Sequence, residues 1–244
     1  MAASHDAMTP DTQPLEIVHA DEHLVAINKP SGMLVHRGWA QDDIVAVDLL
    51  HAQLGRRVWP LHRLDRGTSG VVLFALDVET ARELSAELER GGLTKRYLAL
   101  VRGLAPEGEL LIDYSLRRVD SKAKDRQDAQ TRIRRLGSFE RYSLVEAVPL
   151  TGRTHQIRRH LKHIAHPIIG DVRYGKGDHN RLFRERFGLH RLALHAAELR
   201  WGELAIHAPV PADLAGPLAE MELLGLWSAP AAGQGPREPD GNTP

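Results

Sequence analysis

The sequence contains no cysteine, and no apolar run in its 244 residues approaches the ~18 residues that a membrane-spanning helix needs. The absence of cysteine excludes disulfide bonds, thiolate nucleophiles and cysteine-ligated metals. The N-terminus, Met1 to Asp6, has neither a basic region nor an apolar core of the kind that secretory signals carry. These absences favour a cytoplasmic protein that has no membrane partner.

The sequence also lacks a net charge, because its 32 Lys and Arg balance its 32 Asp and Glu. The two signs are unevenly distributed. Residues 1–30 and 201–244 are acidic, whereas residues 151–176 hold six Lys or Arg against Asp171 alone, and residues 115–135 hold eight against three Asp. A localised positive field attracts phosphates whatever the total charge. The basic middle therefore indicates a nucleic-acid partner, although solvated faces with compensating charges would give the same counts.

The length and composition suit a globular protein, with 42% apolar and 26% charged residues. We expect one folded domain over residues 15–228. Residues 1–14 and 229–244 are expected to be disordered tails, and the second is rich in Ala, Gly and Pro with nothing to bury.

The hydrophobic pattern between the tails predicts strands and helices in irregular alternation. Predicted strands cover residues 15–18 and 24–27 as a hairpin, 71–76, 95–101, several pieces within 109–149 including 142–148, 192–199 and 204–207. Predicted helices cover residues 43–54 stopped by Gly55, 78–90 capped by Asp77, 155–165, 181–187, and 212–224 ended by Gly225. Since no regular βαβ period is present, the pattern favours an α+β fold.

The most unusual segment is the run RLDRGTSG at residues 63–70. Asp65 lies between Arg63 and Arg66, just before two glycines that permit tight or left-handed backbone geometry. Such a loop can present a carboxylate beside guanidinium groups at the edge of a cavity. The alternative is an Asp that only pins the loop through an Arg.

Four motifs, in order, resemble those of the RluA-type RNA pseudouridine synthases. They are NKPSG at 28–32, RLDRGTSG at 63–70, KRYLALVRG at 95–103, and TGRTHQIRRH at 151–160 continued by HPIIGD at 166–171. The resemblance covers residues 15–208. It implies the pseudouridine synthase fold, with a mixed, largely antiparallel sheet flanked by helices and loops.

The resemblance also implies a reaction and three catalytic residues. Asp65 would be the catalytic carboxylate, and the sequence leaves open whether it attacks C1′ or takes a proton from the sugar. Arg158 would pair with Asp65, or would bind phosphate instead. Tyr97 would lie against the uracil and its hydroxyl could relay a proton, unless it is simply a core aromatic. No cofactor is expected, because pseudouridine is an isomer of uridine.

The partner implied by the resemblance is structured RNA. An enzyme that works on a paired base must first extrude it, and the planar guanidinium of Arg63 suits the gap that the base leaves. We expect seven residues to contact RNA: Arg63, Arg66, Arg153, His155, Gln156, Arg159 and Lys162.

Four histidines between 155 and 166 raise the possibility of a metal site. His160 and His163 could share a helix face. Arg and Lys side chains surround them, however, and the nearest acid is Asp171. A dication favours compensating anions, so RNA contact or helix-end packing suits these histidines better and no metal is expected.

Two stretches, LVHR at 34–37 and FGLHRLALHA at 187–196, resemble the TruC-like subgroup, which modifies uridine 65 of certain tRNAs. Gly67 stands where that subgroup has a Pro, and the stretch before Tyr142 is short. A site in ribosomal RNA is therefore the alternative. No S4-type RNA-binding domain is expected, and we expect a monomer.

Three rival functions make distinct predictions. A non-catalytic RNA-binding module would bind RNA without isomerising it. A glycoside hydrolase would need a second positioned acid or a base-activated water, for which Glu146 or Asp171 could serve, and would release free uracil. A metal-dependent nuclease would lose activity when a chelator is added.

Overall fold

The computed structural model describes residues 13–37, 44–119 and 125–227. The predicted tails, apart from residues 13 and 14, and the predicted helix start at Asp43 fall outside these residues. The helices are α1 (Ala46–Leu54), α2 (Val78–Glu89), α3 (Gln156–His163), α4 (Gly177–Phe187) and α5 (Ala212–Glu220), followed by a 3-10 turn at Leu224–Leu226. None of the helices in the described part of the chain has the length and apolar character required to cross a lipid bilayer.

The strands are β1 (Ile17–Ala20), β2 (Leu24–Lys29), β3 (Trp59–Pro60), β4 (Ser69–Ala75), β5 (Leu93–Arg102), β6 (Glu109–Asp113), β7 (Leu116–Arg117), β8 (Arg126–Gln127), β9 (Gln130–Phe139), β10 (Tyr142–Pro149), β11 (Leu194–Trp201) and β12 (Leu204–His207). The main path through the large sheet is β1-β2-β4-β11-β5-β10-β9-β6, with β3 beside β4 and β12 beside β11. Of its pairings, only β4 with β11 is parallel. The predicted α+β fold with a mixed, largely antiparallel sheet is confirmed.

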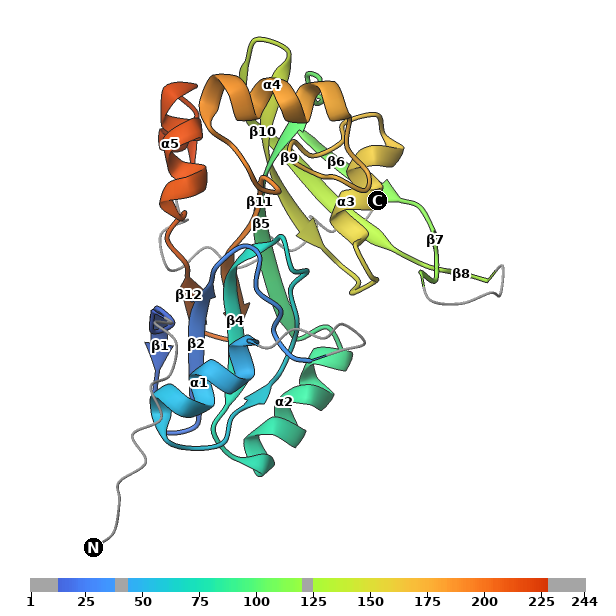
Figure 1. Ribbon diagram of the computed structural model, residues 1–244. Helices are drawn as coiled ribbons and strands as arrows, with labels where there is room; N and C mark the ends of the chain where they lie inside the picture. Colours follow the sequence, from blue (N-terminus) through green and yellow to red (C-terminus); the bar gives the residue numbers. More distant parts are fainter. Residues whose placement is uncertain (1–12, 38–43, 120–124, 228–244) are drawn as a thin grey trace, which may run out of the picture.

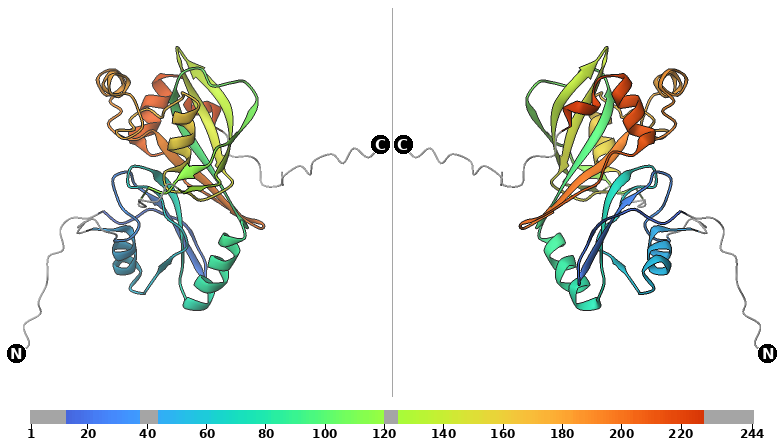
Figure 2. Two further views of the ribbon diagram at one scale, coloured as in Figure 1. Left: turned by 90° about the vertical axis from the view of Figure 1, so that its right-hand side faces the viewer. Right: turned by 90° about the vertical axis from the view of Figure 1, so that its left-hand side faces the viewer.

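Strands β2 and β4 are buried along their whole length because helices cover both faces. Val72 and Phe74 belong to one core cluster with Leu50 of α1, whereas Val71 and Leu73 belong to a second with Leu84 of α2. Side chains alternate between the faces of a strand, so a strand buried on both faces reads as a continuous apolar run. Figure 2 shows α1 and α2 on opposite sides of these strands.

The sheet continues through β5 and β11 from the part of the molecule that holds α1 and α2 to the part that holds α3, α4 and α5 (Figure 1). The first residues of β4 pair with β11, where Ser69 lies opposite His195 and Gly70 opposite Ala196. Gly70 has φ +116, and a Cβ there would lie 2.1 Å from the carbonyl oxygen of Ala196. Only glycine allows this close approach of the two backbones, which joins the loop at 63–68 to the centre of the sheet.

Two helix boundaries differ from the prediction by four residues. Helix α5 ends at Glu220 rather than Leu224, because Glu222 takes a left-handed conformation (φ 58) and the Leu223 amide bonds back to the Leu218 carbonyl. Gly225 therefore lies in the 3-10 turn and not at the end of the helix. Helix α4 begins at Gly177, four residues before the predicted start at Arg181, because its first turn has low intrinsic helix propensity and is not visible in the apolar pattern.

Candidate active site

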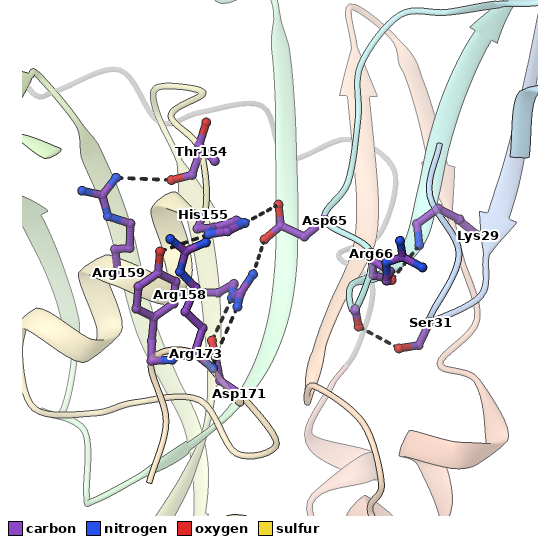
Figure 3. Close-up of polar contacts among 12 residues, drawn as sticks. Lys29, Ser31, Asp65, Arg66, Thr154, His155, Arg158, Arg159, Asp171 and Arg173 are labelled. Atoms are coloured by element: carbon purple, nitrogen blue, oxygen red, sulfur yellow. Dashed lines mark hydrogen bonds and ion pairs between the residues drawn. The ribbon is translucent and has the colours of Figure 1, made fainter. Parts of the chain in front are cut away.

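Asp65 lies in the loop that leads into β4, and several hydrogen bonds hold that loop. The Thr68 amide donates to the Asp65 carbonyl at 3.0 Å, which closes a tight turn. The Gly32 amide donates to the Arg66 carbonyl at 2.8 Å, and the Ser31 hydroxyl donates to the Gly67 carbonyl at 2.8 Å. The NKPSG turn thus supports the loop from behind, and the Asp65 side chain is directed to the other side, toward α3 (Figure 3).

Arg158 of α3 holds two carboxylates at once. Its Nη1 donates to Asp65 Oδ2 at 2.9 Å, and its Nε and Nη2 donate to the two oxygens of Asp171 at 2.7 and 3.0 Å. Burial opposes ionisation of Asp171, but these bonds and the amides of Arg173 and Tyr174 keep its pKa below the ordinary value. The bidentate contact fixes the plane of the guanidinium and so aims Nη1 at Asp65. The predicted pairing of Arg158 with Asp65 is present.

His155 lies at the same place, directly before α3. Its backbone is left-handed (φ 54), its Nδ1 is 3.0 Å from the Tyr174 hydroxyl, and its Nε2 is 3.9 Å from Asp65 Oδ1. Burial lowers the pKa of His155, and the positive charges of Arg158 and Arg173 lower it further. The negative charge of Asp65 has the opposite effect. Rather than lying only on an RNA-facing surface, His155 is a neighbour of the candidate catalytic carboxylate.

Tyr97 is in the middle of β5, between Ala147 of β10 and Ala196 of β11. Its side chain is buried, and burial together with the nearby charge of Asp65 raises its pKa. The phenol is therefore neutral at physiological pH. Its register partners on both neighbouring strands are alanines, and its side chain belongs to the main apolar core.

Lys29, at the end of β2, is fully buried behind the same loop. Its ammonium donates to the carbonyls of Pro30 and Met33 at 2.8 Å and to that of Arg66 at 3.4 Å. Burial lowers its pKa to about 7, and the charge of Arg191 adds to this effect. Lys29 joins the NKPSG turn to the Asp65 loop from the side away from α3 (Figure 3).

Gln156 does not occupy the position that the sequence suggested. Its amide oxygen accepts from the Thr151 hydroxyl and the Arg153 amide, and its amide nitrogen donates to the Gln130 carbonyl and the Thr131 hydroxyl. The side chain is buried with its hydrogen-bonding positions occupied. We therefore revise the expected RNA contact: Gln156 shapes the turn at 151–155 that delivers His155 and Arg158.

The other expected RNA contacts lie around this centre. Arg63 and Arg66 are exposed on the loop, and Lys162 is exposed on α3. Arg159 is half-buried with its Nη1 3.4 Å from the Thr154 carbonyl, and Arg153 donates from Nε to the Asp128 carbonyl at 2.9 Å. Arg159 lies on the α3 side of Asp65, whereas Arg66 lies on the side of the loop that faces Ser31 and Lys29 (Figure 3).

The four histidines that were considered as possible metal ligands do not come together at one point. Buried His160 lies between the Thr131 hydroxyl and the Tyr114 carbonyl, His163 stacks on Tyr114, and His166 Nδ1 is 3.0 Å from the Arg102 carbonyl. Over residues 13–37, 44–119 and 125–227, no group of three or more His, Asp or Glu is arranged to hold a metal ion.

Two residues of the site had no predicted role in the pseudouridine synthase hypothesis. Asp171 was noted as the end of the HPIIGD motif and as an acid for a rival hydrolase, but not as the partner of Arg158. Tyr174 was not singled out, yet its ring lies 5.1 Å from Arg158, 5.8 Å from Lys162 and 5.6 Å from Arg173. One sequence signal could have found them. Asp171 is the only acid in the basic stretch 151–176, and the aromatic Tyr174 follows three positions later.

Known proteins are similar to this chain over most of its length. The family model described as RNA pseudouridylate synthase matches residues 23–163. The chain belongs to this family. It is 46% identical over 209 residues to the tRNA pseudouridine synthase C of Vibrio vulnificus (strain CMCP6), covering 77% of this chain and 84% of that protein. It is 45% identical over 208 residues to the protein of the same name from Haemophilus ducreyi (strain 35000HP / ATCC 700724), covering 77% and 85%.

A solved structure supports the family membership at the level of the fold. The structure of human RNA pseudouridylate synthase domain containing 4 superposes with a TM-score of 0.70 at 26% identity, covering 85% of this chain and 93% of that one. As a member of the RNA pseudouridylate synthase family, the protein is an isomerase that acts on uridine in RNA. The predicted family and enzyme class are confirmed.

Proposed function

We infer that this synthase converts a uridine of tRNA into pseudouridine, at position 65. The relatives named tRNA pseudouridine synthase C act on tRNA by their name and match this chain over three quarters of its length. The resemblance of residues 34–37 and 187–196 to the TruC-like subgroup supports the position.

One observation carries the assignment of the site: Arg158 binds Asp65 while its other edge is bound by Asp171. The Asp65 side chain is 22% exposed, so a ligand can reach it, while the Asp171 side chain is fully covered. A carboxylate that only pinned the loop would not need a guanidinium held rigidly on both edges. Arg158 donates to Oδ2 of Asp65, so Oδ1 is left for the sugar.

Each group has a definite task in the reaction. Asp65 acts on the ribose, by attack at C1′ or by removal of a sugar proton, while the N1–C1′ bond breaks. Arg158 keeps Asp65 charged and oriented. Tyr97, which is neutral and buried, supports the detached uracil while it turns to present C5 to C1′. Arg63 fills the vacancy in the RNA stack.

The decisive experiment compares the protein with Asp65→Asn on a tRNA transcript, with pseudouridine located by carbodiimide modification and primer extension. The protein should form pseudouridine at position 65 without releasing uracil, and the variant should bind the transcript with unchanged affinity but form no product. Free uracil would favour the hydrolase, and product from Asp65→Asn at the normal rate would refute the assignment. Mapping total RNA from cells with and without the gene distinguishes tRNA from ribosomal RNA.

We further propose that the enzyme acts in the cytoplasm as a monomer. The curated relatives above are bacterial tRNA-modifying enzymes, which supports the location. The mass of the free protein in solution, measured by light scattering, tests the monomer: a mass near 27.1 kDa supports it and twice that mass contradicts it.

A further inference from the structure

Strand β5 carries Lys95 on the same face as Tyr97. Side chains alternate between the two faces of a strand, so Arg96 lies on the opposite face from these two residues. The ion pairs that Arg96 makes with Glu146 and Glu198 agree with this division. Lys95 therefore lies on the active-site face of the sheet, about 7 Å along the strand from Tyr97.

The segment that leads to Asp65 runs along this face of β5. At one end, Leu61 and Leu93 both pack against the second core cluster and line the same small apolar gap. At the other end, the charge of Asp65 is close enough to Tyr97 to raise the pKa of the phenol, together with burial. The segment and the strand thus lie side by side, and the residues between their ends are neighbours.

Lys95 lies between these two ends and has no partner for its charge. Its side chain is half-buried, and no hydrogen bond or ion pair joins its ammonium group to any part of the chain that the structure describes. Burial lowers the pKa of Lys95 to about 8, so the group is mostly charged at neutral pH. A partly desolvated cation without a counter-charge is unfavourable, and an anion from a ligand would relieve that cost.

The neighbouring His62 cannot act as that partner. Its Nε2 accepts a hydrogen bond from the Leu73 amide at 3.2 Å, so the proton of the neutral ring is on Nδ1. Burial and the charge of Lys95 lower the pKa of His62, which the Arg63 backbone opposes, and the ring stays neutral. Neither nitrogen of the ring is then a free acceptor. The partner of the ammonium group therefore has to come from the substrate.

We propose that Lys95 binds a backbone phosphate of the RNA beside the target uridine, an inference that rests on the proposed function. A phosphodiester is the anion that an RNA strand presents at every nucleotide. The separation of Lys95 from Tyr97 is comparable to one nucleotide of an extended strand. A uridine held between Asp65 and Tyr97 therefore brings a flanking phosphate within reach of this flexible side chain, whose ammonium group suits a phosphate as a compact charge.

The test uses the full-length protein and tRNAs assembled by ligation, each with one methylphosphonate in place of a phosphate near the target uridine. A methylphosphonate keeps the backbone but carries no charge. The affinities of the wild type and of Lys95→Met are measured for the unmodified and the modified tRNAs at several salt concentrations. Met keeps a long apolar side chain without the ammonium group. Arg90→Ala, at the exposed end of α2, is the control for the loss of one positive charge.

We expect Lys95→Met to bind unmodified tRNA roughly tenfold more weakly, as for the loss of one charge-assisted hydrogen bond. The slope of log affinity against log salt should fall by about 0.7 to 0.9. At one flanking position, the methylphosphonate should weaken binding by the wild type and leave Lys95→Met unaffected, because that contact is already lost. Without RNA, Lys95→Met should melt no lower than the wild type, since an unpaired charge has been removed. Arg90→Ala should behave as the wild type does.

Additive effects of Lys95→Met and of the methylphosphonate at every position tested would overturn the proposal, and so would an unchanged affinity of Lys95→Met. A lower melting temperature of Lys95→Met together with additive effects would assign Lys95 to the stability of the fold instead. The proposed function fails separately, if the wild type forms no pseudouridine in the unmodified tRNA. If pseudouridine forms and no position shows coupling, only the role of Lys95 is refuted.

Discussion

Arg158 donates a 2.9 Å hydrogen bond to Asp65 across 93 positions of the chain, while Asp171 holds the rest of its guanidinium with two further bonds. Arg158 comes from the start of α3, Asp65 from the loop before β4, and Asp171 from the loop before α4. Three separate segments therefore have to reach their final places before the carboxylate of Asp65 has its partner.

Asp171→Asn should lower both activity and stability. The amide cannot balance the charge of Arg158, so the guanidinium loses its fixed plane and Nη1 is no longer aimed at Asp65. We expect kcat to fall by roughly 10- to 100-fold from misplacement, and the free energy of unfolding to fall by about 3 kcal/mol because a buried ion pair loses one member. Single-turnover kinetics and urea denaturation measure the two effects.

Asp178→Asn is the matched control, because this exposed carboxylate of α4 makes only a 3.5 Å ion pair with Arg181. It should change neither quantity. If Asp171→Asn behaved like this control, Asp171 would have no part in orienting Arg158.

The two glycines of the RLDRGTSG run should respond differently to alanine. At Gly70 a Cβ would strike the Ala196 carbonyl at 2.1 Å and the backbone is left-handed, so Gly70→Ala should cost roughly 3 kcal/mol or more of unfolding free energy. At Gly67 a Cβ would lie 3.3 Å from Leu192 Cβ without unusual φ, so Gly67→Ala should be tolerated to within about 1 kcal/mol. Thermal melts of the two variants and the wild type measure this difference. Equal melting temperatures for Gly70→Ala and Gly67→Ala would contradict the prediction.

Arg159 and Lys162 should contribute to RNA affinity through charge. Replacing either by Ala should weaken tRNA binding and should reduce the slope of log affinity against log salt by about 0.7 to 0.9 for each lost phosphate contact. Neither side chain bonds to Asp65, so kcat at saturating tRNA should stay within about threefold of the wild type.

Arg90→Ala is the control for charge alone, since Arg90 is exposed at the end of α2 and pairs with Glu87. This variant should leave the salt slope unchanged. A slope that fell equally for Arg90→Ala would show that net charge, and not a contact at α3, governs binding.

The stability of the protein should fall as the medium becomes acidic, partly because of His195. This buried side chain lies between the Ser69 hydroxyl, 2.8 Å from Nδ1, and the Ala208 carbonyl, 3.2 Å from Nε2, and burial lowers its pKa to about 4. The unfolded chain, with an ordinary His pKa near 6.5, then binds the proton more readily. Stability present above pH 6.5 is therefore lost as the pH falls toward 4, by about 3 kcal/mol from this group.

Urea denaturation at several pH values measures this effect. His195→Gln, which does not titrate, should lose less unfolding free energy than the wild type between pH 6.5 and pH 4. The same loss in both proteins would mean that other histidines, such as buried His160, account for the acid sensitivity.

Much of the fold was predictable from short stretches of sequence. Asp77 caps α2 through the Thr80 amide, and Gly55 ends α1 in a left-handed conformation, because caps depend on neighbours a few residues away. The end of α5 was not predictable in this way, since Leu223 bonds back to Leu218 before the glycine that resembled a stop signal.

The sequence by itself determined the family, the mixed sheet, and Asp65 with Arg158 as candidate partners, because the motifs that carry them are local and ordered. Only the tertiary structure decided what surrounds them. It turned Gln156 into the interior to meet Gln130 and Thr131, and it brought His155 beside Asp65. The physical reason is that burial and hydrogen-bond partners depend on which strands and loops become neighbours, and those neighbours lie tens of residues apart in the chain.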